Sequence, residues 1–424
     1  MTRGANSLVP SWPECQLTDL VDDRGITYGI VQPGQPQADG VPILRVNNFR
    51  SGGLELDDVM RVAPGVAARF KRSTLRGGEV LITLVGSTGQ VAVAPPGLSG
   101  WNVARAVGVV PVRDRDSARW VAWCLQAPSA RAYLDARLNT TVQSTLNLRD
   151  LASLSIPMPP AAERDAIASV LGVLDDKIDS NRRLVGLLQK AMEAMFSARF
   201  VNFLGVEEFG ESEIGLIPSG WRPGALTDLG RFVNGKAFTK HANGRGRPVL
   251  RIRELNDGVD KATPQSDTEA GDDFVARFDD ILFAWSGSLG VHRWSGDESL
   301  INQHIFKVIP RGWPYWFVFA WINAHMATFR QIARDKATTM GHIQRRHLDE
   351  ARVPLPTAEA IDLADKIIGP IDAQRAALIR ESWTLGSVRD ALLPKLVSGR
   401  IRIPDAEDPA EAIEPAAEAI SAAS

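Results

Sequence analysis

Two loops in the second half of the chain combine basic, amide, hydroxyl and imidazole side chains. Segment 234–247 contains Lys236, Lys240, His241, Asn243, Arg245 and Arg247, and segment 334–347 contains Thr338, Thr339, His342, Gln344 and Arg345. Lys and Arg bind phosphates, whereas Asn, Gln, Ser, Thr and His also hydrogen-bond to the edges of bases. These loops therefore indicate a nucleic-acid contact, with a solvated surface loop as the simpler alternative.

The first half offers a weaker set of such residues. A basic stretch contains Lys71, Arg72 and Arg76, and segment 138–147 supplies Thr140, Thr141 and Gln143. Each half also has a glycine-rich turn, which adds Ser87 and Thr88 in the first half and Ser288 in the second. Trp285, Trp294, Trp313, Trp316 and Trp321 are more simply core residues than stacking surfaces.

Motifs for catalysis and for metal binding are missing. We find no GxxxxGK[ST] loop, dinucleotide fingerprint, N/D-P-P-Y/F motif or HExxH pattern. We therefore expect no catalytic residue, metal or cofactor in this chain. One alternative is a nuclease with dispersed carboxylates, for which Asp279 and Asp280 are the candidates, although these residues more simply close a turn before a strand at 281–284.

The elements that must hold these loops occur twice. Segment 156–179 is similar to 353–375, and shorter matches keep the same order: Leu17–Leu20 with Leu226–Leu229, Pro42–Val46 with Pro248–Ile252, Gly86–Gly89 with Gly287–Gly290, Asn102 with Asn302, and Thr140–Thr141 with Thr338–Thr339. Two copies of one fold explain this conserved order. The chain is therefore predicted to be a pseudo-symmetric tandem.

Each copy is predicted to be a mixed domain of short strands and a helix. β-Branched runs at 41–46, 79–85 and 103–112 are separated by Gly/Pro-rich turns, and helical patterns follow at 118–138 and 316–333. This pattern is typical of the α+β class. We place the two domains at 1–158 and 201–356, long helices at 159–200 and 357–403, and a disordered acidic tail at 404–424.

Apolar residues that alternate at spacings of four and three predict a coiled coil after each domain. The first seam is Ile167, Leu171, Leu174, Ile178, Asn181, Val185, Leu188, Met192 and Met195, and the second is Ile367, Ile371, Leu378, Leu385, Val388 and Leu392. Asn181 either fixes the register or lies on a solvated face, and Gly369-Pro370 is expected to kink or restart the second helix. We expect the helices to pair antiparallel, over about 58 Å at ~1.5 Å per residue.

Composition sets outer limits. The chain has 424 residues, 44% of them hydrophobic, and a formal net charge of −2. The tail holds six acids and no base, so residues 1–403 carry a net charge of +4. No apolar run approaches the ~20 residues of a membrane span, and the first residues do not resemble a signal peptide. We expect a cytoplasmic protein in which Cys15 and Cys124 are free thiols.

Several motifs resemble those of the specificity subunits of type I restriction-modification systems. They are Ile156-Pro157-Met158-Pro159, the helix start from Glu163 to Ile167, the run from Leu171 to Ile178, the stretch Ile214–Trp221, and Leu392–Leu396 followed by Gly399 and Ile401. The resemblance covers nearly the whole chain apart from the acidic tail.

This resemblance implies a non-catalytic subunit with two target-recognition domains, each of which reads half of an asymmetric, bipartite site in double-stranded DNA. It also implies two methylase subunits, which carry S-adenosylmethionine, and two restriction or translocase subunits, which use ATP and Mg. The helices would set the spacer between the half-sites and dock the partners through Ile167, Leu174, Ile178, Asn181, Ile371, Leu378 and Leu385. A standalone DNA-binding or architectural protein is the main alternative.

Overall fold

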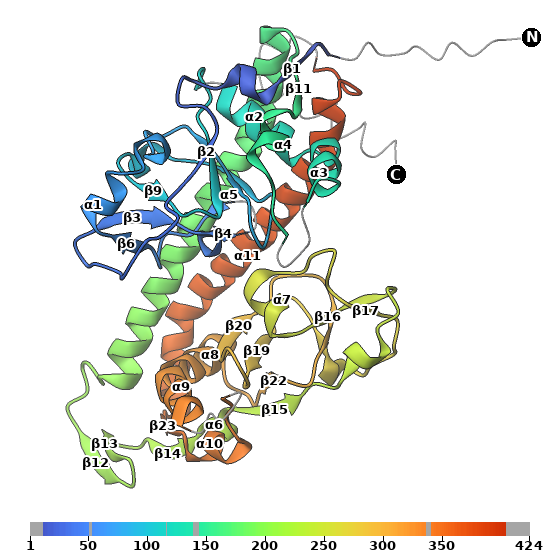
Figure 1. Cartoon of the computed structure of the whole chain (residues 1–424). Coiled ribbons are helices and arrows are strands. Elements are labelled where there is room, and N and C mark those ends of the chain that lie inside the picture. Colours follow the sequence, from blue (N-terminus) through green and yellow to red (C-terminus); the bar gives the residue numbers. More distant parts are fainter. Residues whose placement is uncertain (1–11, 51–52, 116, 139–143, 336–340, 404–424) are drawn as a thin grey trace, which may run out of the picture. The chain divides into compact units, whose positions relative to one another are not determined.

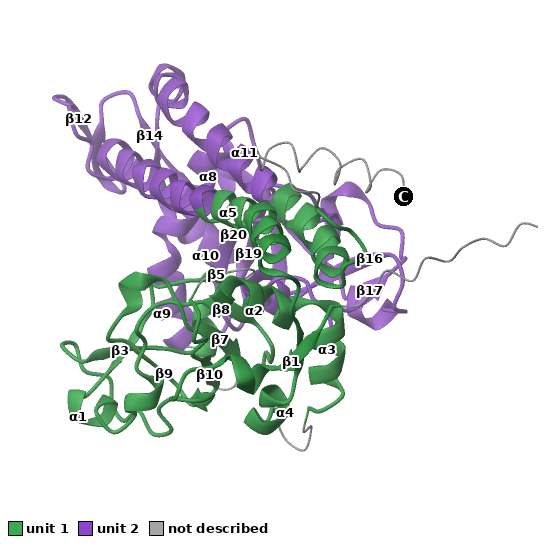
Figure 2. Cartoon of the chain, turned by 90° about the horizontal axis from the view of Figure 1, so that it is seen from above, with its two compact units in different colours: residues 1–179, 383–424 green, residues 180–382 purple. Residues whose placement is uncertain are grey.

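A computed structural model describes residues 12–50, 53–115, 117–138, 144–335 and 341–403 (Figure 1). The predicted tail and five predicted contact residues (Thr140, Thr141, Gln143, Thr338 and Thr339) lie outside the described residues. The chain divides into two compact units: unit 1 is residues 1–179 with 383–424, and unit 2 is residues 180–382 (Figure 2). Each unit contains one copy of the repeat and a part of each long helix.

Unit 1 is built on two small sheets. One has the strand order β2-β10-β7-β8 (Thr27–Tyr28, Val107–Val110, Val80–Thr83, Val91–Val93), and the other is β6-β3-β9 (Met60–Val62, Val41–Leu44, Asn102–Val103). Two further pairs are β1 (Glu14–Gln16) with β11 (Ser155–Pro157) and β4 (Phe49–Arg50) with β5 (Gly53–Leu54). The short helices are η1 (Leu17–Leu20), η2 (Val46–Asn48), α1 (Pro64–Ala67), η3 (Lys71–Ser73), η4 (Pro96–Leu98) and α4 (Leu148–Ala152).

Unit 2 has the same plan. Its sheets are β15-β22-β19-β20 (Gly230–Asn234, Ile305–Pro310, Ile281–Ala284, Gly290–Arg293) and β17-β16-β21-β18 (Gln265–Ser266, Arg247–Leu250, Ser299–Ile301, Val275–Ala276). Two further pairs are β14 (Arg222–Ala225) with β23 (Arg352–Leu355) and the hairpin β12 (Phe209–Ser212) with β13 (Gly215–Pro218). The short helices are α6 (Leu226–Leu229), η6 (Phe238–His241), α7 (Ile252–Asp257), η7 (Asp272–Phe274) and α10 (Arg345–Glu350).

Strand register supports the repeat and corrects one of its matches. Leu44 pairs in parallel with Val103, and its counterpart Leu250 pairs in parallel with Ile301. Val103 therefore corresponds to Ile301, so Asn102 corresponds to Leu300 and not to Asn302. The predicted match of Asn102 with Asn302 is wrong by two positions, because it was based on residue identity alone.

A capped turn recurs in both units. Leu17–Leu20 and Leu226–Leu229 each form one helical turn. In each turn the third residue, Asp19 or Asp228, accepts a hydrogen bond from the backbone N–H of the residue before the turn, at 3.1 and 2.9 Å. Such a cap satisfies an otherwise orphaned backbone donor. This match is a repeated piece of scaffold.

Each predicted domain helix is in fact two helices. The pattern at 118–138 forms α2 (Ser117–Gln126) and α3 (Pro128–Asp135), because Pro128 cannot continue α2 and begins α3 instead. The pattern at 316–333 forms α8 (Tyr315–Ala324) and α9 (Met326–Asp335), with the break at His325.

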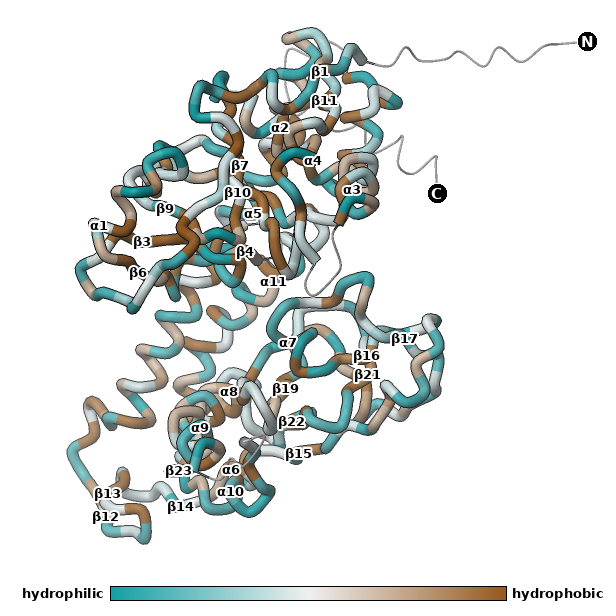
Figure 3. Tube along the Cα trace, viewed as in Figure 1, coloured by the Kyte–Doolittle hydropathy of each residue, from teal (hydrophilic) through white to brown (hydrophobic). Residues whose placement is uncertain are grey.

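The core of each unit lies between the sheet and these helices. In unit 1, Ile82 and Val110 are buried against Trp120 and Val121. In unit 2, Phe283 and Val308 belong to one cluster with Phe317, Phe329 and other aromatic residues. Figure 3 shows hydrophobic strands in brown, such as β3 of the second sheet of unit 1. Burial of this apolar surface is the main favourable contribution to folding.

The long helices are α5 (Ala161–Phe196), extended by a π-helical turn η5 (Ser197–Val201), and α11 (Ala358–Val397). In unit 1 the first turns of α5 share a core cluster with the last turns of α11, and Arg389 pairs with Asp175 at 2.9 Å. In unit 2, Asn181 Nδ2 donates to Glu381 Oε2 at 2.8 Å. These contacts confirm the antiparallel pairing. They also favour the register role for Asn181, since its side chain is only 2% exposed.

The predicted seams hold for part of their length. Ile167, Leu171, Leu174, Ile178 and Asn181 are buried, but Met195 is 38% exposed, and Phe196 and Phe200 face the core instead. In α11, Ile367 is 50% exposed, whereas Ile361, Ala364 and Ile368 are buried. The domain of unit 2 packs against these turns of α5 and α11 from one side, so the buried residues lie on a different face of each helix than the seam predicts. The helix also continues through Gly369-Pro370 without the predicted restart.

Candidate nucleic-acid interface

One edge of the four-stranded sheet in unit 2 gathers polar residues from distant segments. Neighbouring strands are antiparallel, so β15 and β19 end at the edge where β22 and β20 begin. The last residue of β15 is Asn234, and the turn after β19 carries Trp285 and Ser288. His304 directly precedes β22. We call this region the unit 2 edge.

Trp285 is the centre of this edge. Its indole Nε1 donates to Asn234 Oδ1 at 2.9 Å, and its ring centroid lies 5.4 Å from that of His304 and 6.5 Å from that of His342. A backbone bridge between Ser286 and His342 joins the described end of the predicted loop 334–347 to the glycine-rich turn that carries Ser288. Two predicted contact residues far apart in sequence, Ser288 and His342, are thus on neighbouring turns. Gln344 and Arg345 follow at the start of α10 and are exposed.

Most of the tryptophans are core residues, as predicted. Trp294, Trp316 and Trp321 are buried. Trp285 is an exception, because it is half-buried at the polar edge. It is therefore the tryptophan of this group best placed to contact a base.

A glycine fixes the distance between two turns of the edge. A Cβ on Gly235 would lie 2.2 Å from the carbonyl oxygen of Asn302, which no other residue tolerates without a shift. A Cβ on the corresponding Gly29 of unit 1 would lie 1.8 Å from the carbonyl oxygen of Val103, the counterpart of Ile301. Next to Gly235, the backbone N–H of Lys236 donates to the Ile301 carbonyl at 3.0 Å, and its ammonium lies 4.0 Å from the Phe274 ring.

The basic loop after this glycine has members of two kinds. Asn243 donates to Asp267 at 2.7 Å, and half-buried Arg247 donates to the Thr268 carbonyl at 3.3 Å, so both hold the loop in shape. Lys240, His241 and Arg245 have exposed side chains. These three are the better candidates for phosphate contacts.

The unit 1 edge is the matching region in the first copy, and its side chains differ. Tyr28, which ends β2, is 46% exposed, and Arg105 occupies the turn before β10. The turn with Ser87 and Thr88 is joined to Thr145 through a bridge from Val85. Ser87 is exposed and Thr88 half-buried.

The predicted basic residues of unit 1 lie close to this edge. A pocket of about 520 Å³ is lined by Tyr28, Arg69, Lys71 and Arg72, among others. Arg72 is held by a hydrogen bond from its Nε to the Arg24 carbonyl at 2.8 Å. Arg76 is exposed, while its backbone N–H donates to buried Glu79 at 2.8 Å. Lys71 and Arg72 therefore adjoin Tyr28, an arrangement that suits a phosphate beside a stacked base.

Comparisons with known proteins give a consistent family. Residues 218–374 match the model of the type I restriction modification DNA specificity domain. The specificity subunit of the Escherichia coli type I restriction enzyme EcoBI is 28% identical over 163 residues, which are 38% of this chain and 34% of that protein. The MjaIX specificity subunit of Methanocaldococcus jannaschii is 22% identical over 351 residues, 77% of this chain and 78% of that protein. Residues 218–374 therefore match this DNA specificity domain, and the chain is similar to type I restriction enzyme specificity subunits.

Among solved structures, the S subunit of a type I restriction-modification system from M. genitalium is 16% identical to this chain, with a TM-score of 0.48. That comparison covers 93% of this chain and 99% of the other. The match to the E. coli protein, by contrast, spans only about a third of its length, 34%.

The two carboxylates considered for a nuclease, Asp279 and Asp280, are both engaged in ion pairs. Asp280 accepts from the Arg277 backbone at 2.7 Å and pairs with Lys307 at 2.7 Å. Glu79, the counterpart of Asp280 in unit 1, likewise accepts from the backbone N–H of the residue three positions before it, Arg76, and pairs with Arg24. A repeated, charge-neutralised turn is scaffold, so the turn interpretation of Asp280 holds.

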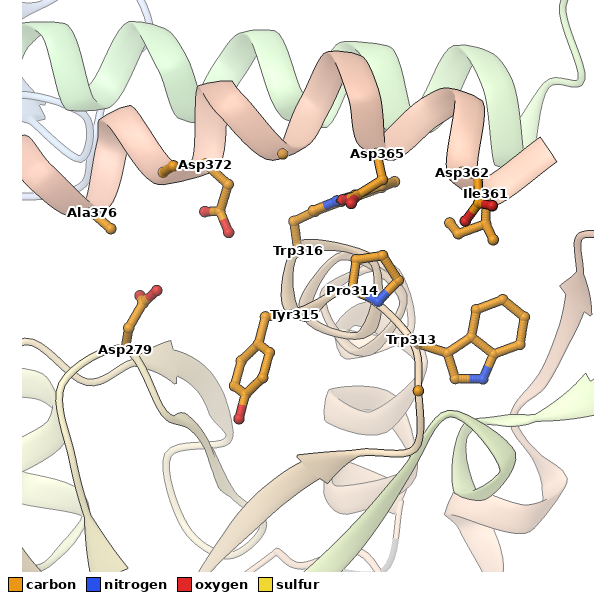
Figure 4. Close-up of a pocket in the computed structure, with 13 residues that line it drawn as sticks. Asp279, Trp313, Pro314, Tyr315, Trp316, Ile361, Asp362, Asp365, Asp372 and Ala376 are labelled. Atoms are coloured by element: carbon orange, nitrogen blue, oxygen red, sulfur yellow. The ribbon is translucent and has the colours of Figure 1, made fainter. Parts of the chain in front are cut away.

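Asp279 lies in an acidic pocket of about 580 Å³ between α11 and the start of α8 (Figure 4). It pairs with Arg293 and, at 2.7 Å, with Arg375, which also contacts Asp372 at 2.8 Å. Asp365 accepts from Trp316 Nε1 at 2.7 Å. Within the described residues, no group of three or more His, Cys, Asp or Glu side chains is arranged to hold a metal ion.

The helix residues predicted to dock partners are mostly buried inside this chain itself. Five of them (Ile167, Leu174, Ile178, Asn181 and Leu378) are at most 7% exposed, and Ile371 and Leu385 are half-buried. The seam pattern identifies the contact between α5 and α11, so it is a poor guide to a partner surface. The two thiols are free as expected, with Cys124 buried. None of the helices in the described part of the chain combines the length and hydropathy of a bilayer crossing.

Proposed function

We propose that this chain is the non-catalytic DNA-reading subunit of a type I restriction-modification complex, and that it recognises an asymmetric, bipartite site. The observation that carries the proposal is that two equal sheet frames end in unlike edges. Tyr28 and Arg105 in unit 1 stand where unit 2 has Asn234 and Gln303. Equal frames with different base-contacting side chains suit two different half-sites.

The basic loops complete each edge with phosphate contacts. Lys71 and Arg72 serve this role in unit 1, and Lys240 and Arg245 serve it in unit 2. Phosphate contacts position a protein on DNA, whereas contacts to base edges specify the sequence. The chain therefore divides affinity and specificity between neighbouring loops of each unit.

Partner subunits would dock on an apolar helix face of unit 2. Leu184 and Leu187 of α5 are 40% and 64% exposed, and Leu363 of α11 is 51% exposed. Leu187 is nine residues from buried Phe196, which places the two on opposite sides of α5 at 3.6 residues per turn. An exposed apolar stripe opposite the core is typical of a helix that packs against another protein.

The register extends this face across both helices. Met195 lies fourteen residues after Asn181 and Ile367 fourteen residues before Glu381, so the antiparallel register places the two opposite each other. Their side chains are 38% and 50% exposed. We assign this face to the methylase subunits. The family's division of labour gives two methylase subunits with S-adenosylmethionine and two restriction or translocase subunits with ATP and Mg, acting in the cytoplasm, while the long helices set the spacer.

A domain exchange tests the proposal. The complex with its methylase subunits should modify adenines in a split motif, and replacing residues 1–155 by the same region of another family member should change one half of the motif. Change in both halves, or methylation by this chain alone, contradicts it. Leu187→Gln should weaken co-purification of the methylase, whereas Gln189→Ala, on another side of the same helix, should not. Equal recovery with both variants leaves the standalone DNA-binding alternative.

A further inference from the structure

The turn before β22 contains polar atoms that the folded chain shields from solvent without pairing them. Gln303 Oε1 and His304 Nδ1 have no hydrogen-bond partner among the described residues, and both atoms are inaccessible. Buried acceptors are nearly always paired in folded proteins, and each exception requires an explanation. A ligand that donates hydrogen bonds at this position is such an explanation.

The turn is rigidly placed at the unit 2 edge. The backbone N–H of Trp285 donates to the His304 carbonyl at 3.2 Å, and the Ile305 N–H closes the turn on the Asn302 carbonyl at 3.2 Å. On the other side, Gly235 packs against the Asn302 carbonyl. The backbone on both sides of Gln303 is therefore fixed, through Asn302 and through His304 beside the Trp285 ring, without a hydrogen bond from the Gln303 side chain.

Unit 1 repeats the feature at a different residue of the same edge. Gln90 directly precedes β8, and its Oε1 is also inaccessible and without a partner among the described residues. The turn that corresponds to Gln303 and His304 carries Arg105 and Ala106, because Ile30 bridges to Ala104 as Lys236 does to Asn302. Both edges thus present an unsatisfied glutamine oxygen, from different strands.

We propose that Gln303 and His304 are specificity-determining residues that read a base in the half-site of unit 2, a step that rests on the proposed function. Gln pairs in a bidentate manner with adenine: its Oε1 accepts from the N6 amino group, while its Nε2 donates to N7. The unpaired Oε1 of Gln303 fits the acceptor half of this pair once the half-buried side chain turns outward to meet the base. His304, beside Trp285, contacts the neighbouring base.

The test uses the specificity subunit with its methylase subunits and DNA duplexes in which each base pair of the mapped site is changed singly. Gln303→Met keeps the volume but removes both polar atoms. It should lower discrimination at one base pair by ~10- to 100-fold without changing the salt dependence of binding. Its thermal stability should equal or exceed that of the parent, because an unpaired buried acceptor is gone. Gln331→Met, at an exposed position of α9, is the matched control and should change neither quantity.

His304→Phe, which keeps a ring beside Trp285, provides a second variant and should relax the adjacent position. Full discrimination at every base pair in both variants overturns the proposal, as does a large loss of stability in Gln303→Met, which would mark a structural role. If the parent complex itself showed no preference for any sequence, the proposed function would fail instead, so the two failures are distinguishable.

Discussion

Arg375 should hold the recognition domain of unit 2 against α11, and its removal should be costly. Its side chain is 4% exposed and contacts Asp279 at 2.7 Å and Asp372 at 2.8 Å. Burial alone would lower the pKa of Arg375, but the hydrogen bond that it donates to Asp279 and the charge of Asp372 raise the pKa above its usual value. The guanidinium is therefore charged and fully engaged.

The expected magnitude follows from these distances. Two unit charges 2.7 Å apart attract by ~6 kcal/mol at an effective dielectric of ~20, and desolvation of the ions offsets much of that. Breaking a buried pair by removing one partner typically costs roughly 3–5 kcal/mol. We expect about 3 kcal/mol for Arg375→Met, because Arg293 still contacts both carboxylates.

Hydrogen exchange in the full chain measures this effect, since two units do not unfold as one two-state system. About 3 kcal/mol corresponds to a ~100-fold loss of amide protection in β19 and β22. Amides of β7 and β10 in unit 1 should be unaffected. Arg231→Met removes an exposed ion pair with Asp273 and should change little. A loss below ~10-fold in Arg375→Met would refute the argument that this network is a buried clamp.

Three further predictions concern the edge and its supports. Lys240→Gln and Arg245→Gln should each reduce the salt dependence of DNA binding by about one ion, and an unchanged slope would remove the residue from the phosphate contacts. Gly235→Ala should destabilise unit 2 by ~1–3 kcal/mol in thermal melts through its overlap with the Asn302 carbonyl, whereas Gly271→Ala, with open space around it, should be tolerated. Burial lowers the pKa of His292, so the unfolded chain takes up a proton first and the free energy of unfolding falls as the pH drops below ~6.5. His292→Leu should therefore flatten the pH dependence of stability between about pH 7.5 and 5.5. An equal slope in the parent and the variant would exclude His292 as the cause.

The sequence predicted those parts of the fold in which residues recur at a regular spacing or in a repeated order. The alternation of four and three placed α5 and α11 and their antiparallel contact, and the order of short matches indicated two copies. The spacing of apolar residues along a helix does not show which other surfaces also pack against that helix. Phe196 and Ile368 replaced Met195 and Ile367 in the core because the domain of unit 2 adds a second neighbour to the pair. The partner surface that we propose therefore combines residues outside the predicted seams, such as Leu184 and Leu187, with the exposed seam residues Met195 and Ile367.

The candidate site was predictable only where composition marked it. A run of Lys, Arg and Gly drew attention to 234–247, but Asn243 and Arg247 are used to hold that loop. Gln303 and His304 escaped notice because two polar residues between apolar strands have no distinctive spacing. Their position becomes meaningful only when β22 is seen to start beside Trp285. The sole signal in the sequence was polar residues next to strands in a matched segment.

The duplication separates what must stay constant from what can vary. The close contact with a neighbouring backbone carbonyl requires a glycine at positions 29 and 235. The turn before the following strand is closed by an acidic side chain at positions 79 and 280. These positions fix where each edge lies, and none of them has to touch DNA. The residues beside them, Tyr28 or Asn234, are free to differ because the frame does not depend on their side chains. An edge built this way can change its base contacts without refolding, which is the physical condition for two half-sites to diverge within one chain.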